Sequence, residues 1–502
     1  MEWITECISN HKLCGDGSLK TLPTRVLDLG TGDQCLEART ITGEGKVSRY
    51  GTLSHCWGQR GNHRILTKTT LGSWLTAFSI EELPQTYQDA IAVAKRLVLQ
   101  YLWIDSLCII QDDEEDWERE SSKMADVYQN SYITIAATCA ADSNVGIFSN
   151  ARPIHRPKVI NYSQGGIKSQ LQASVCLSHH AYDPIHKSHN SFYHWALQNS
   201  LDLPLLSRSW VYQERLLSPR VLHFMKEELV FECVETKPCE CNIFASVRMS
   251  VKEKHAKSLH GSLEWAGSNM LALRSRWHNI VEEYSELSMT FEKDKLPAIS
   301  GVASQMQSFR NENYFAGLWS SSFREDLCWR VASKSQGPKP KKWRAPSWSW
   351  AAVNSAVSCG WLSREAHSAD VHDIVCNYSS TGKLGQLDSA WMVISGSLCR
   401  GTLYRTASLD MNIGTYHVRT ESRHILRSLF LDYDFNQELV IESLDIFLFL
   451  LYGSDESKQQ SGTLLILRQI PREMDTYEQI GITSHDAGSY FNTYSKARIK
   501  VI

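Results

Sequence analysis

Hydrophobic and polar positions change their period repeatedly between about residues 50 and 235. Continuous apolar runs bounded by turn residues predict strands, and apolar positions three or four apart predict helices. The expected strands are "YGTLSHC" (50–56), "YLWIDSLCII" (101–110), "YITIAATCA" (132–140), "RVLHF" (220–224) and "ELVFEC" (228–233). The expected helices are "LPQTYQDAIAVAKRLV" (83–98), "DDEEDWERESSKMADVYQNS" (112–131) and "SRSWVYQERLLS" (207–218).

Strands and helices therefore alternate along this part of the chain. Such alternation predicts an α/β fold with a doubly wound, mostly parallel sheet. The almost continuous apolar run at 101–110 is typical of a central strand that is covered on both faces. A stretch at about 143–205 shows no clear periodicity, and we interpret it as an insertion between the third strand and the third helix.

The second half of the chain has a different pattern. Helical spacing dominates 236–330, where one face carries Trp277, Ile280, Val281, Tyr284 and Leu287. A junction rich in Pro, Lys and Ser follows at 333–350, and the remaining chain reads as β-rich. The expected divisions are an N-terminal segment (1–45), an α/β domain (46–235), a helical connector (236–330) and a β-rich C-terminal region (331–502).

Composition and charge narrow the class of protein. Hydrophobic residues make up 42% and charged residues 21% of the 502 positions, which is typical of a globular protein. The formal net charge of −3 and the lack of a basic-aromatic array give no reason to expect nucleic-acid binding. The first residues lack the pattern of a signal peptide, and the longest apolar run, "IFLFLLY", is too short to span a bilayer. A cytoplasmic location is the default expectation.

Polar residues follow the predicted strands where a ligand site is expected. In a doubly wound sheet, ligands bind at the carboxyl ends of the strands. The candidate binding residues at these ends and on the helix at 207–218 are Ser54, His55, Trp57, Gly58, Asp105, Gln111, Arg208 and Trp210. We expect them to converge on one cleft.

Glu214 is the candidate catalytic residue. It shares a helix face with Trp210, Val211 and Leu217, and a carboxylate on such an apolar face is costly unless it is paired or used. One interpretation is a pocket carboxylate that binds a hydroxyl group or a developing positive charge. The other is a buried ion pair with an arginine, for which the sequence offers Arg208, Arg215 and Arg220.

Asp105 has two interpretations of the same kind. It contacts a ligand, or it caps a helix and accepts hydrogen bonds from loop amides. Cys56, next to His55, and Cys108 raise a thiol-nucleophile hypothesis, but adjacent strand residues point to opposite faces, so His55 is poorly placed to activate Cys56. Both thiols are interpreted as core residues.

No metal site is expected. Fourteen cysteines are scattered along the chain and suit buried thiols better than disulfides. Two sets have spacing suggestive of metal ligands, namely Cys7, His11 and Cys14, and Cys233, Cys239 and Cys241. Neither set supplies the four ligands of a structural zinc site in one compact motif. We therefore expect no metal and no prosthetic group.

Taken together, several stretches resemble the fungal heterokaryon-incompatibility (HET) domain family. They read "LPTRVLDLG", "YGTLSHCWG", "LPQTYQDAIAVAKRL", "YLWIDSLCIIQDDEEDWERESSKMADVYQNSYITIAAT" and "SRSWVYQERLLSPRVLHF", and they cover about 22–225. The later "DKLPAISGVA", "YFAGLWSSSFREDLCWR" and "APSWSWAAVN" are similar to regions that often accompany this domain. The resemblance implies a role in fungal allorecognition, in which fusion of incompatible cells triggers programmed cell death.

The family is proposed to be distantly related to TIR domains, which have a flavodoxin-like fold. Many TIR enzymes cleave NAD with a glutamate in the helix after the third strand. By this resemblance Glu214 takes the catalytic position, and Ser54 to Gly58 help to build the nucleotide pocket. The insertion at about 143–205 departs from the TIR pattern, and we expect it to reshape the cleft.

Two functional hypotheses follow. The first is an NAD glycohydrolase-like enzyme, with NAD as substrate, that acts after self-association. The second is a non-enzymatic recognition and death-signalling module that assembles with itself or with another protein of an incompatibility system. A thiol hydrolase that uses Cys108 is a lesser third alternative.

Overall fold

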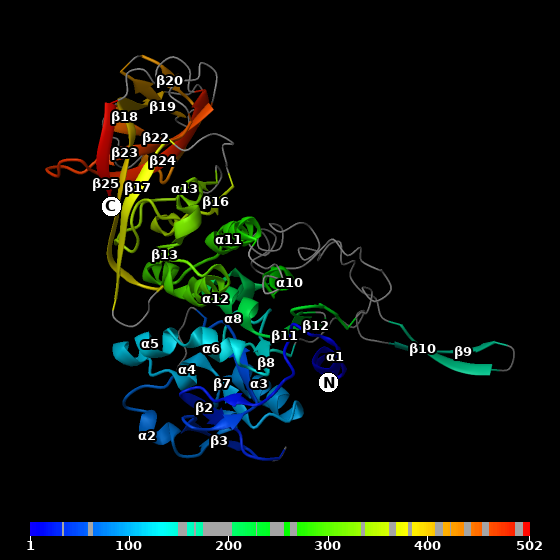
Figure 1. The fold of residues 1–502 in the computed structure, drawn as a ribbon. Helices are drawn as coiled ribbons and strands as arrows, with labels where there is room; N and C mark the ends of the chain where they lie inside the picture. The colour runs from blue at the N-terminus through cyan, green and yellow to red at the C-terminus, as the bar shows by residue number, and fades with distance from the viewer. Residues whose placement is uncertain are drawn as a thin grey trace. The chain divides into compact units, whose positions relative to one another are not determined.

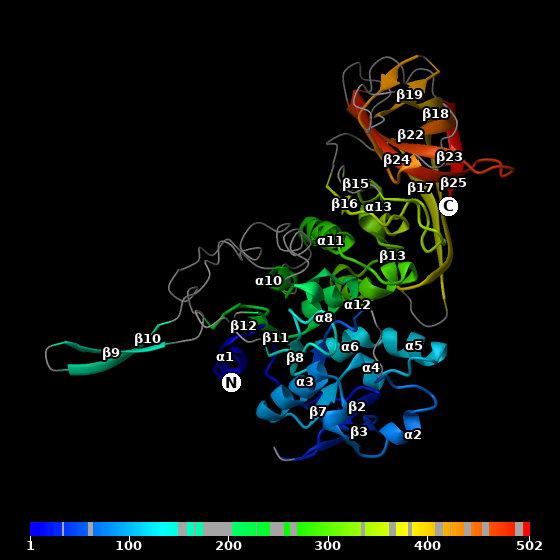
Figure 2. The ribbon, with the colours of Figure 1, turned by 180° about the vertical axis from the view of Figure 1, so that it is seen from behind.

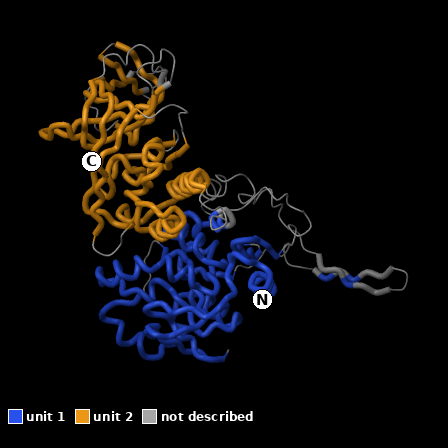
Figure 3. Tube along the Cα trace, in the orientation of Figure 1, with its two compact units in different colours: residues 1–267 blue, residues 268–502 orange. Residues whose placement is uncertain are grey.

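A computed structural model describes the chain apart from sixteen gaps. The gaps are 33–34, 59–63, 149–157, 165–166, 174–202, 227, 241–255, 262–268, 333–336, 361–367, 380–383, 407–414, 422, 436–442, 454–460 and 487–494. The chain forms two compact units, residues 1–267 and 268–502 (Figure 3). The boundary between them lies within the range expected as a helical connector, 236–330.

An eight-stranded sheet organises the described part of unit 1. Its spatial order is β12 (Leu229–Cys233), β11 (Arg220–Phe224), β8 (Ile133–Ala136), β5 (Tyr50–Ser54), β7 (Tyr101–Trp103), β2 (Arg25–Asp28), β3 (Glu37–Thr42) and β6 (Phe78–Ser79). The four central strands, β11, β8, β5 and β7, pair in parallel. The outer pairings are antiparallel. Figure 1 shows β8, β7, β2 and β3 in succession across this unit.

The α/β fold expected for this region is confirmed, and the sheet is mixed. Each of the five strands expected between 50 and 233 is present, but β12 runs antiparallel to β11. Strands β2 and β3, from the first 45 residues, extend the same sheet on its other side. The parallel strands are buried along almost their whole length, as central strands covered on both faces are.

Helices and short strands complete unit 1. The α-helices are α1 (Glu2–Asn10), α2 (Leu71–Trp74), α3 (Gln85–Arg96), α4 (Asp105–Cys108), α5 (Glu114–Ser121), α6 (Met124–Gln129), α8 (Ser209–Leu217) and α10 (Ala256–Gly261), and the 3-10 helices are η1 (Ile80–Glu82) and η2 (Pro204–Ser207). The short pairs are β1 (Lys20–Thr21) with β4 (Val47–Ser48), and β9 (Lys158–Gln164) with β10 (Ile167–Ala173). Helices α6 and α8 pack against each other, and Figure 2 shows them side by side from behind.

Two expected elements differ in the structure. The strand expected at 101–110 ends at Trp103, and α4 begins at Asp105. An apolar run of this length cannot distinguish a buried strand from a buried helical turn, because both bury every side chain. The single helix expected at 112–131 is two helices, α5 and α6, separated by Ser122 and Lys123.

Unit 2 has a helical and a β-rich part. The helices are α11 (Met270–Ser285), α12 (Ser300–Arg310) and α13 (Phe323–Asp326), with 3-10 turns η4 (Glu292–Lys295), η5 (Pro297–Ile299), η6 (Ser320–Ser322) and η7 (Trp350–Ala352). The apolar face expected on α11 is buried. Two short antiparallel pairs join β13 (Tyr314–Phe315) with β14 (Leu318–Trp319), and β15 (Arg330–Val331) with β16 (Val357–Ser358).

A nine-stranded sheet forms the end of the chain and confirms the expected β-rich region. Its main order is β20 (Ile425–Leu426), β19 (Thr415–Thr420), β18 (Leu387–Thr406), β22 (Ser443–Tyr452), β23 (Ser461–Gln469), β24 (Thr476–Asp486) and β21 (Leu429–Leu431). Strands β17 (Asp370–Tyr378) and β25 (Ser495–Val501) both pair with β18. None of the helices described in either unit has the length and apolar character needed to cross a bilayer.

Candidate functional site

The candidate site lies where the central parallel strands end. Strand β5 ends at Ser54, and the chain continues through His55, Cys56 and Trp57 to Gly58. Its neighbour β7 ends two residues before Asp105. The carboxyl ends of parallel strands lie at one edge of a sheet, so these residues are brought together as the sequence predicted. Residues 59–63, which continue the first loop, lie outside the described part.

Ser54 and Glu214 are in direct contact. The Ser54 hydroxyl donates a hydrogen bond to Oε2 of Glu214 at 2.5 Å, and both residues are buried. The hydroxyl of Tyr128, on α6, donates to the main-chain carbonyl of Leu53 at 3.4 Å and is near enough to Glu214 to lower the pKa of its carboxyl. Helix α8 packs on α6, which places the carboxyl beside both hydroxyls. Glu214 is therefore anchored to the end of β5 and to α6.

The environment of Glu214 raises the pKa of its carboxyl toward neutral pH. Burial raises the pKa of the Glu214 carboxyl to about 7 because it disfavours the charged form. The negative charge of Asp105 acts in the same direction. The hydrogen bonds from Ser54 and Tyr128 and the charge of Arg208 act in the opposite direction. Near neutral pH the carboxyl is consequently present in both protonation states.

The arginines that could have neutralised Glu214 have other partners. Arg215 forms two hydrogen bonds, of 2.7 and 2.8 Å, with the carboxylate of Glu232 on β12. Arg220 donates to the main-chain carbonyls of Cys14 and Gly15, and Arg208 donates to the carbonyl of His55 at 2.6 Å. Among the described residues, the carboxyl of Glu214 accepts a hydrogen bond from Ser54 and forms no ion pair with these arginines, although the charge of Arg208 acts on it.

Asp105 connects the two loops. Its Oδ2 accepts a hydrogen bond from Trp57 Nε1 at 2.9 Å, and its Oδ1 accepts one from the amide of Ser106 at 2.7 Å. Its Oδ1 also lies 3.8 Å from Nδ1 of His55. The side chain is 25% exposed, so it remains open to solvent while it orients the indole. Asp105 therefore accepts a backbone amide hydrogen bond, one of the roles the sequence suggested, and also positions Trp57.

His55 is buried and held from both sides. Its Nε2 lies 3.0 Å from the hydroxyl of Tyr87, which in turn contacts the Ser106 hydroxyl at 2.8 Å. Burial lowers the pKa of His55 to about 4; Asp105 opposes this shift and Arg208 adds to it. The imidazole is therefore neutral at neutral pH, and it supports the loop rather than supplying a charge.

The geometry gives no support to a thiol nucleophile. Burial raises the pKa of the Cys108 thiol to about 12, so its reactive thiolate form is scarce. Burial also raises the pKa of Cys56. Both side chains are buried, which agrees with their interpretation as core residues.

Gly58 makes the turn after β5. Its φ of +90° lies in the region that side chains disfavour, and a Cβ there would lie 2.4 Å from Cβ of Asp142. Only glycine fits this close approach between the β5 loop and the loop after β8.

The remaining candidates lie around the same residues and are half-buried. Gln111 donates to the main-chain carbonyls of Asp105 and Ile109. Trp210 packs edge-on against Trp117 of α5, with ring centroids 6.5 Å apart. Trp57, Gly58 and Arg208 are also half-buried, whereas Ser54, His55 and Glu214 are buried.

Sequence reasoning missed two tyrosines of this cluster. Tyr128 and Tyr87 were assigned only as helix residues, yet each places its hydroxyl on a candidate site residue. A polar tip on an otherwise buried helix face was the signal, because a buried phenol needs a hydrogen-bond partner.

The comparison with protein families gives one match. Residues 50–214 match the family model described as heterokaryon incompatibility protein (HET). The matched segment begins at the first residue of β5 and ends at Glu214, so it contains every candidate site residue. No curated protein and no solved structure matches the chain.

Proposed function

We propose that the heterokaryon-incompatibility domain, which this chain carries over residues 50–214, cleaves NAD in a TIR-like manner. Cleavage would serve allorecognition and programmed cell death. The observation that carries the proposal is the hydrogen bond between Ser54, at the end of a central parallel strand, and Glu214, whose pKa is raised to about 7.

Strand order supports a doubly wound, flavodoxin-like arrangement. The parallel strands lie in the order β7-β5-β8-β11, which is second, first, third and fourth along the chain. The connection from β5 to β7 runs in one direction and the next two run in the other. Because such crossovers are right-handed, α3 belongs on one face of the sheet and α6 and α8 on the opposite face. Ser54 ends β5 beside β8, where the order reverses and where ligands bind in such sheets.

The position of Glu214 along the chain also suits the proposal. It lies on α8, which follows β8, the third parallel strand. Cleavage of the bond between nicotinamide and ribose develops positive charge on the ribose. A carboxylate that is buried and hydrogen-bonded there would stabilise this charge and hold ribose hydroxyls.

Neighbouring residues suit binding of a nucleotide. Trp57 is half-buried, and Asp105 fixes its indole nitrogen, so an aromatic ring of the kind that stacks on a base lies beside Asp105. Asp105 offers a solvent-accessible carboxylate that suits ribose hydroxyls. Arg208 supplies a positive charge for a diphosphate.

A non-enzymatic assembly module is the second candidate, and one observation favours it. Glu214 is only 6% exposed, and its carboxyl already accepts a hydrogen bond from Ser54 and lies near the hydroxyl of Tyr128. A substrate would have to displace these contacts or rely on a rearrangement caused by self-association. If Glu214 is only structural, the domain would signal through the surface that it presents to its own copies or to another incompatibility protein.

Expression in fungal cells separates the two candidates. We expect the wild-type chain to lower cellular NAD and cause death when triggered, and Glu214→Gln to do neither at equal protein level. Glu44→Gln, which removes a carboxylate from an exposed turn outside the candidate site, is the matched control and should retain both effects. Cell death by Glu214→Gln without loss of NAD would support the assembly module and reject NAD cleavage.

A further inference from the structure

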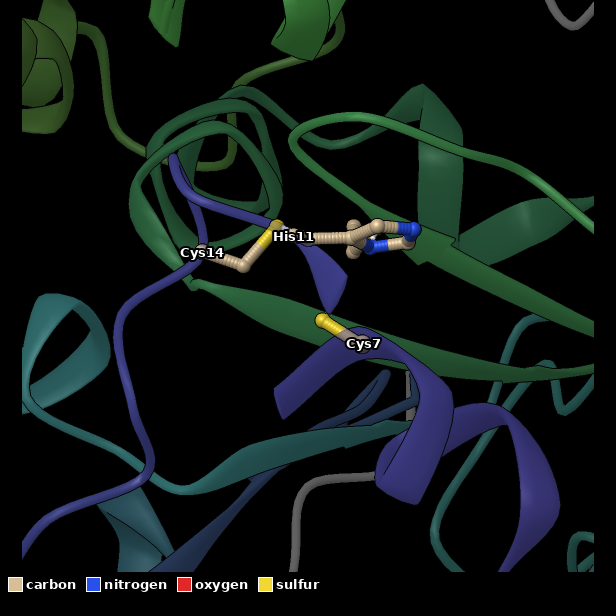
Figure 4. A group of neighbouring side chains, drawn as sticks. Cys7, His11 and Cys14 are labelled. Carbon is tan, nitrogen blue, oxygen red and sulfur yellow. Dashed lines mark hydrogen bonds between the residues drawn. The ribbon is translucent and has the colours of Figure 1, made fainter. Parts of the chain in front are cut away.

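Four potential metal ligands meet at the edge of the sheet in unit 1. They are Cys7 on α1, His11 and Cys14 just after α1, and Cys233 at the end of β12. Their ligand atoms all lie within 4.8 Å of one another. Figure 4 shows the side chains of Cys7, His11 and Cys14 converging on one space. The group is distinct from the Ser54–Glu214 site, since it shares no residue with it.

The spacing of the ligand atoms suits a tetrahedral ion. Zinc lies about 2.3 Å from sulfur and about 2.0 Å from nitrogen, so tetrahedral ligand atoms lie roughly 3.5–3.8 Å apart. His11 Nδ1 is 3.3 Å from Cys233 Sγ and 4.0 Å from Cys14 Sγ. Small side-chain shifts are enough to reach coordination distance. We propose that Cys7, His11, Cys14 and Cys233 bind one structural zinc ion.

The surroundings are built to hold these ligands in place. The main-chain amide of Thr236 donates to Cys233 Sγ at 3.3 Å, a contact that stabilises a thiolate. The same turn is closed by a hydrogen bond from the Cys233 amide to the Thr236 carbonyl. On the other side, Arg220 donates to the carbonyl of Cys14 and so fixes the loop after α1.

Charge in the surroundings favours the loaded site. Three thiolates and one Zn²⁺ carry a net charge of −1, which needs compensation when it is buried. Lys257 on α10 is 1% exposed, and its Nζ lacks a hydrogen-bond partner among the described residues. Its ammonium interacts electrostatically with Glu232 and, more weakly, with Cys233 and Cys14, and Arg220 interacts with Cys7. Positive charge from two elements therefore acts on the group.

The site is structural rather than catalytic. The protein supplies all four ligands, three of them buried, whereas catalytic zinc keeps a position open for water or substrate. The ion would join the first helix to the edge strand β12, more than two hundred residues later in the chain. It would thus close the domain around the sheet that carries the candidate active site.

The proposal replaces the sequence-based expectation that no metal binds. That expectation treated two local sets separately, and neither had four ligands. In the structure, Cys233 from the second set joins all three residues of the first set, Cys7, His11 and Cys14. Cys239 is buried nearby on the chain but is not part of the four-residue group, and Cys241 lies outside the described residues.

The direct test is the metal content of the full-length chain, purified under reducing conditions without chelator or metal-affinity resin. Elemental analysis is expected to find about one zinc per chain, as a closed Cys₃His site requires. Cys7→Ser and Cys233→Ser should lose most of it, and the matched control Cys239→Ser should retain it. His11→Cys should also retain it, because Cys₄ is an equally good zinc site, whereas His11→Ala should bind more weakly.

A second measurement on the wild-type chain alone keeps the test valid if the variants fail to fold. The metal is first removed with a chelator, and cobalt or zinc is then added. Cobalt should give the visible bands of a tetrahedral thiolate site, and added zinc should remove them and raise the melting temperature. The proposal is overturned if the wild-type chain neither contains zinc nor takes it up. It is equally overturned by a disulfide within the group that persists after purification under reducing conditions, or by unchanged zinc in Cys233→Ser.

Discussion

The hydroxyl of Ser54, at the end of β5, donates a hydrogen bond to Glu214 on α8, 160 residues later in the chain. The contact connects the loop that opens the candidate site to the residue expected to perform the chemistry. It also explains how a glutamate is tolerated on a buried helix face, since hydroxyl groups rather than an arginine satisfy it. Burial raises the pKa of this carboxyl to about 7 against the opposing effect of the hydroxyls, which makes it available for proton-linked chemistry.

The first prediction concerns the pH dependence of stability. The pKa of Glu214 is about 7 in the folded chain against an ordinary value of 4.5, so the folded state retains a proton that the unfolded state releases. This contribution to stability is complete below about pH 4.5, declines as pH rises, and is lost above about pH 7. Glu214→Gln has no carboxyl at this position, so its stability lacks this pH dependence. The wild-type stability relative to the variant should fall by about 3 kcal/mol across this range.

Denaturant unfolding of both chains at several pH values measures this difference. Glu44→Gln, at an exposed turn after β3, is the control for loss of a negative charge. A difference between wild type and Glu214→Gln that stays constant from pH 4.5 to 7.5 would show that Glu214 is not held in the folded state as described.

The second prediction compares two buried glutamates of one domain. Glu232 is paired with Arg215 and lies near His223 Nε2 at 3.2 Å. Burial acts to raise the pKa of Glu232, but the charges of Arg215 and Lys237 hold it well below its usual range. Glu232→Gln leaves the Arg215 guanidinium without its counter-charge, so we expect a loss of about 3–5 kcal/mol.

At pH 8, Glu214→Gln should cost far less than Glu232→Gln, because it removes a charge that burial already disfavours. Thermal unfolding of the two variants in the same buffer is the measurement. Equal loss of stability would mean that Glu214 is as tightly ion-paired as Glu232, contrary to its observed partners.

The third prediction concerns the turn after β5. A side chain at Gly58 meets both an unfavourable φ of +90° and Cβ of Asp142 at 2.4 Å. Gly58→Ala should therefore destabilise the chain by about 1–3 kcal/mol. Gly72→Ala is the matched control, because Gly72 lies in α2 with no neighbour within 4 Å of the added Cβ. It should be neutral or slightly stabilising, and a similar loss in both variants would contradict the proposed role of Gly58.

The hydrophobic pattern predicted the main elements of the first unit, because each has regularly spaced apolar residues or is bounded by clear turn residues. The strand 220–224 was predicted to the residue, and α3 was predicted within two residues at each end. The strand expected at 101–110 was wrong beyond Trp103, since an unbroken apolar run carries no period to reveal the helical turn at Asp105. The hydrophobic pattern of a single strand also cannot predict the direction in which it pairs, and β12 pairs with β11 in the antiparallel direction.

The candidate site was predictable in part for the same reason. The rule that ligands bind at strand ends located Ser54 and Asp105, and the isolated carboxylate on an apolar face identified Glu214. Tyr128 was missed, because helical spacing shows that a residue is buried but not which residue its hydroxyl meets. Cys233 was separated from Cys7 for a similar reason, since their contact depends on the whole sheet between them.

The most direct test of the central claim is the rate of nicotinamide release from NAD by the purified full-length chain, measured alone and after forced oligomerisation. We expect release by the oligomerised wild-type chain and a loss of at least about a hundredfold in Glu214→Gln, the scale on which loss of a charge-stabilising group acts. Glu44→Gln should retain the wild-type rate. No release by the oligomerised wild-type chain, or equal release by Glu214→Gln, would show that the domain does not cleave NAD through Glu214.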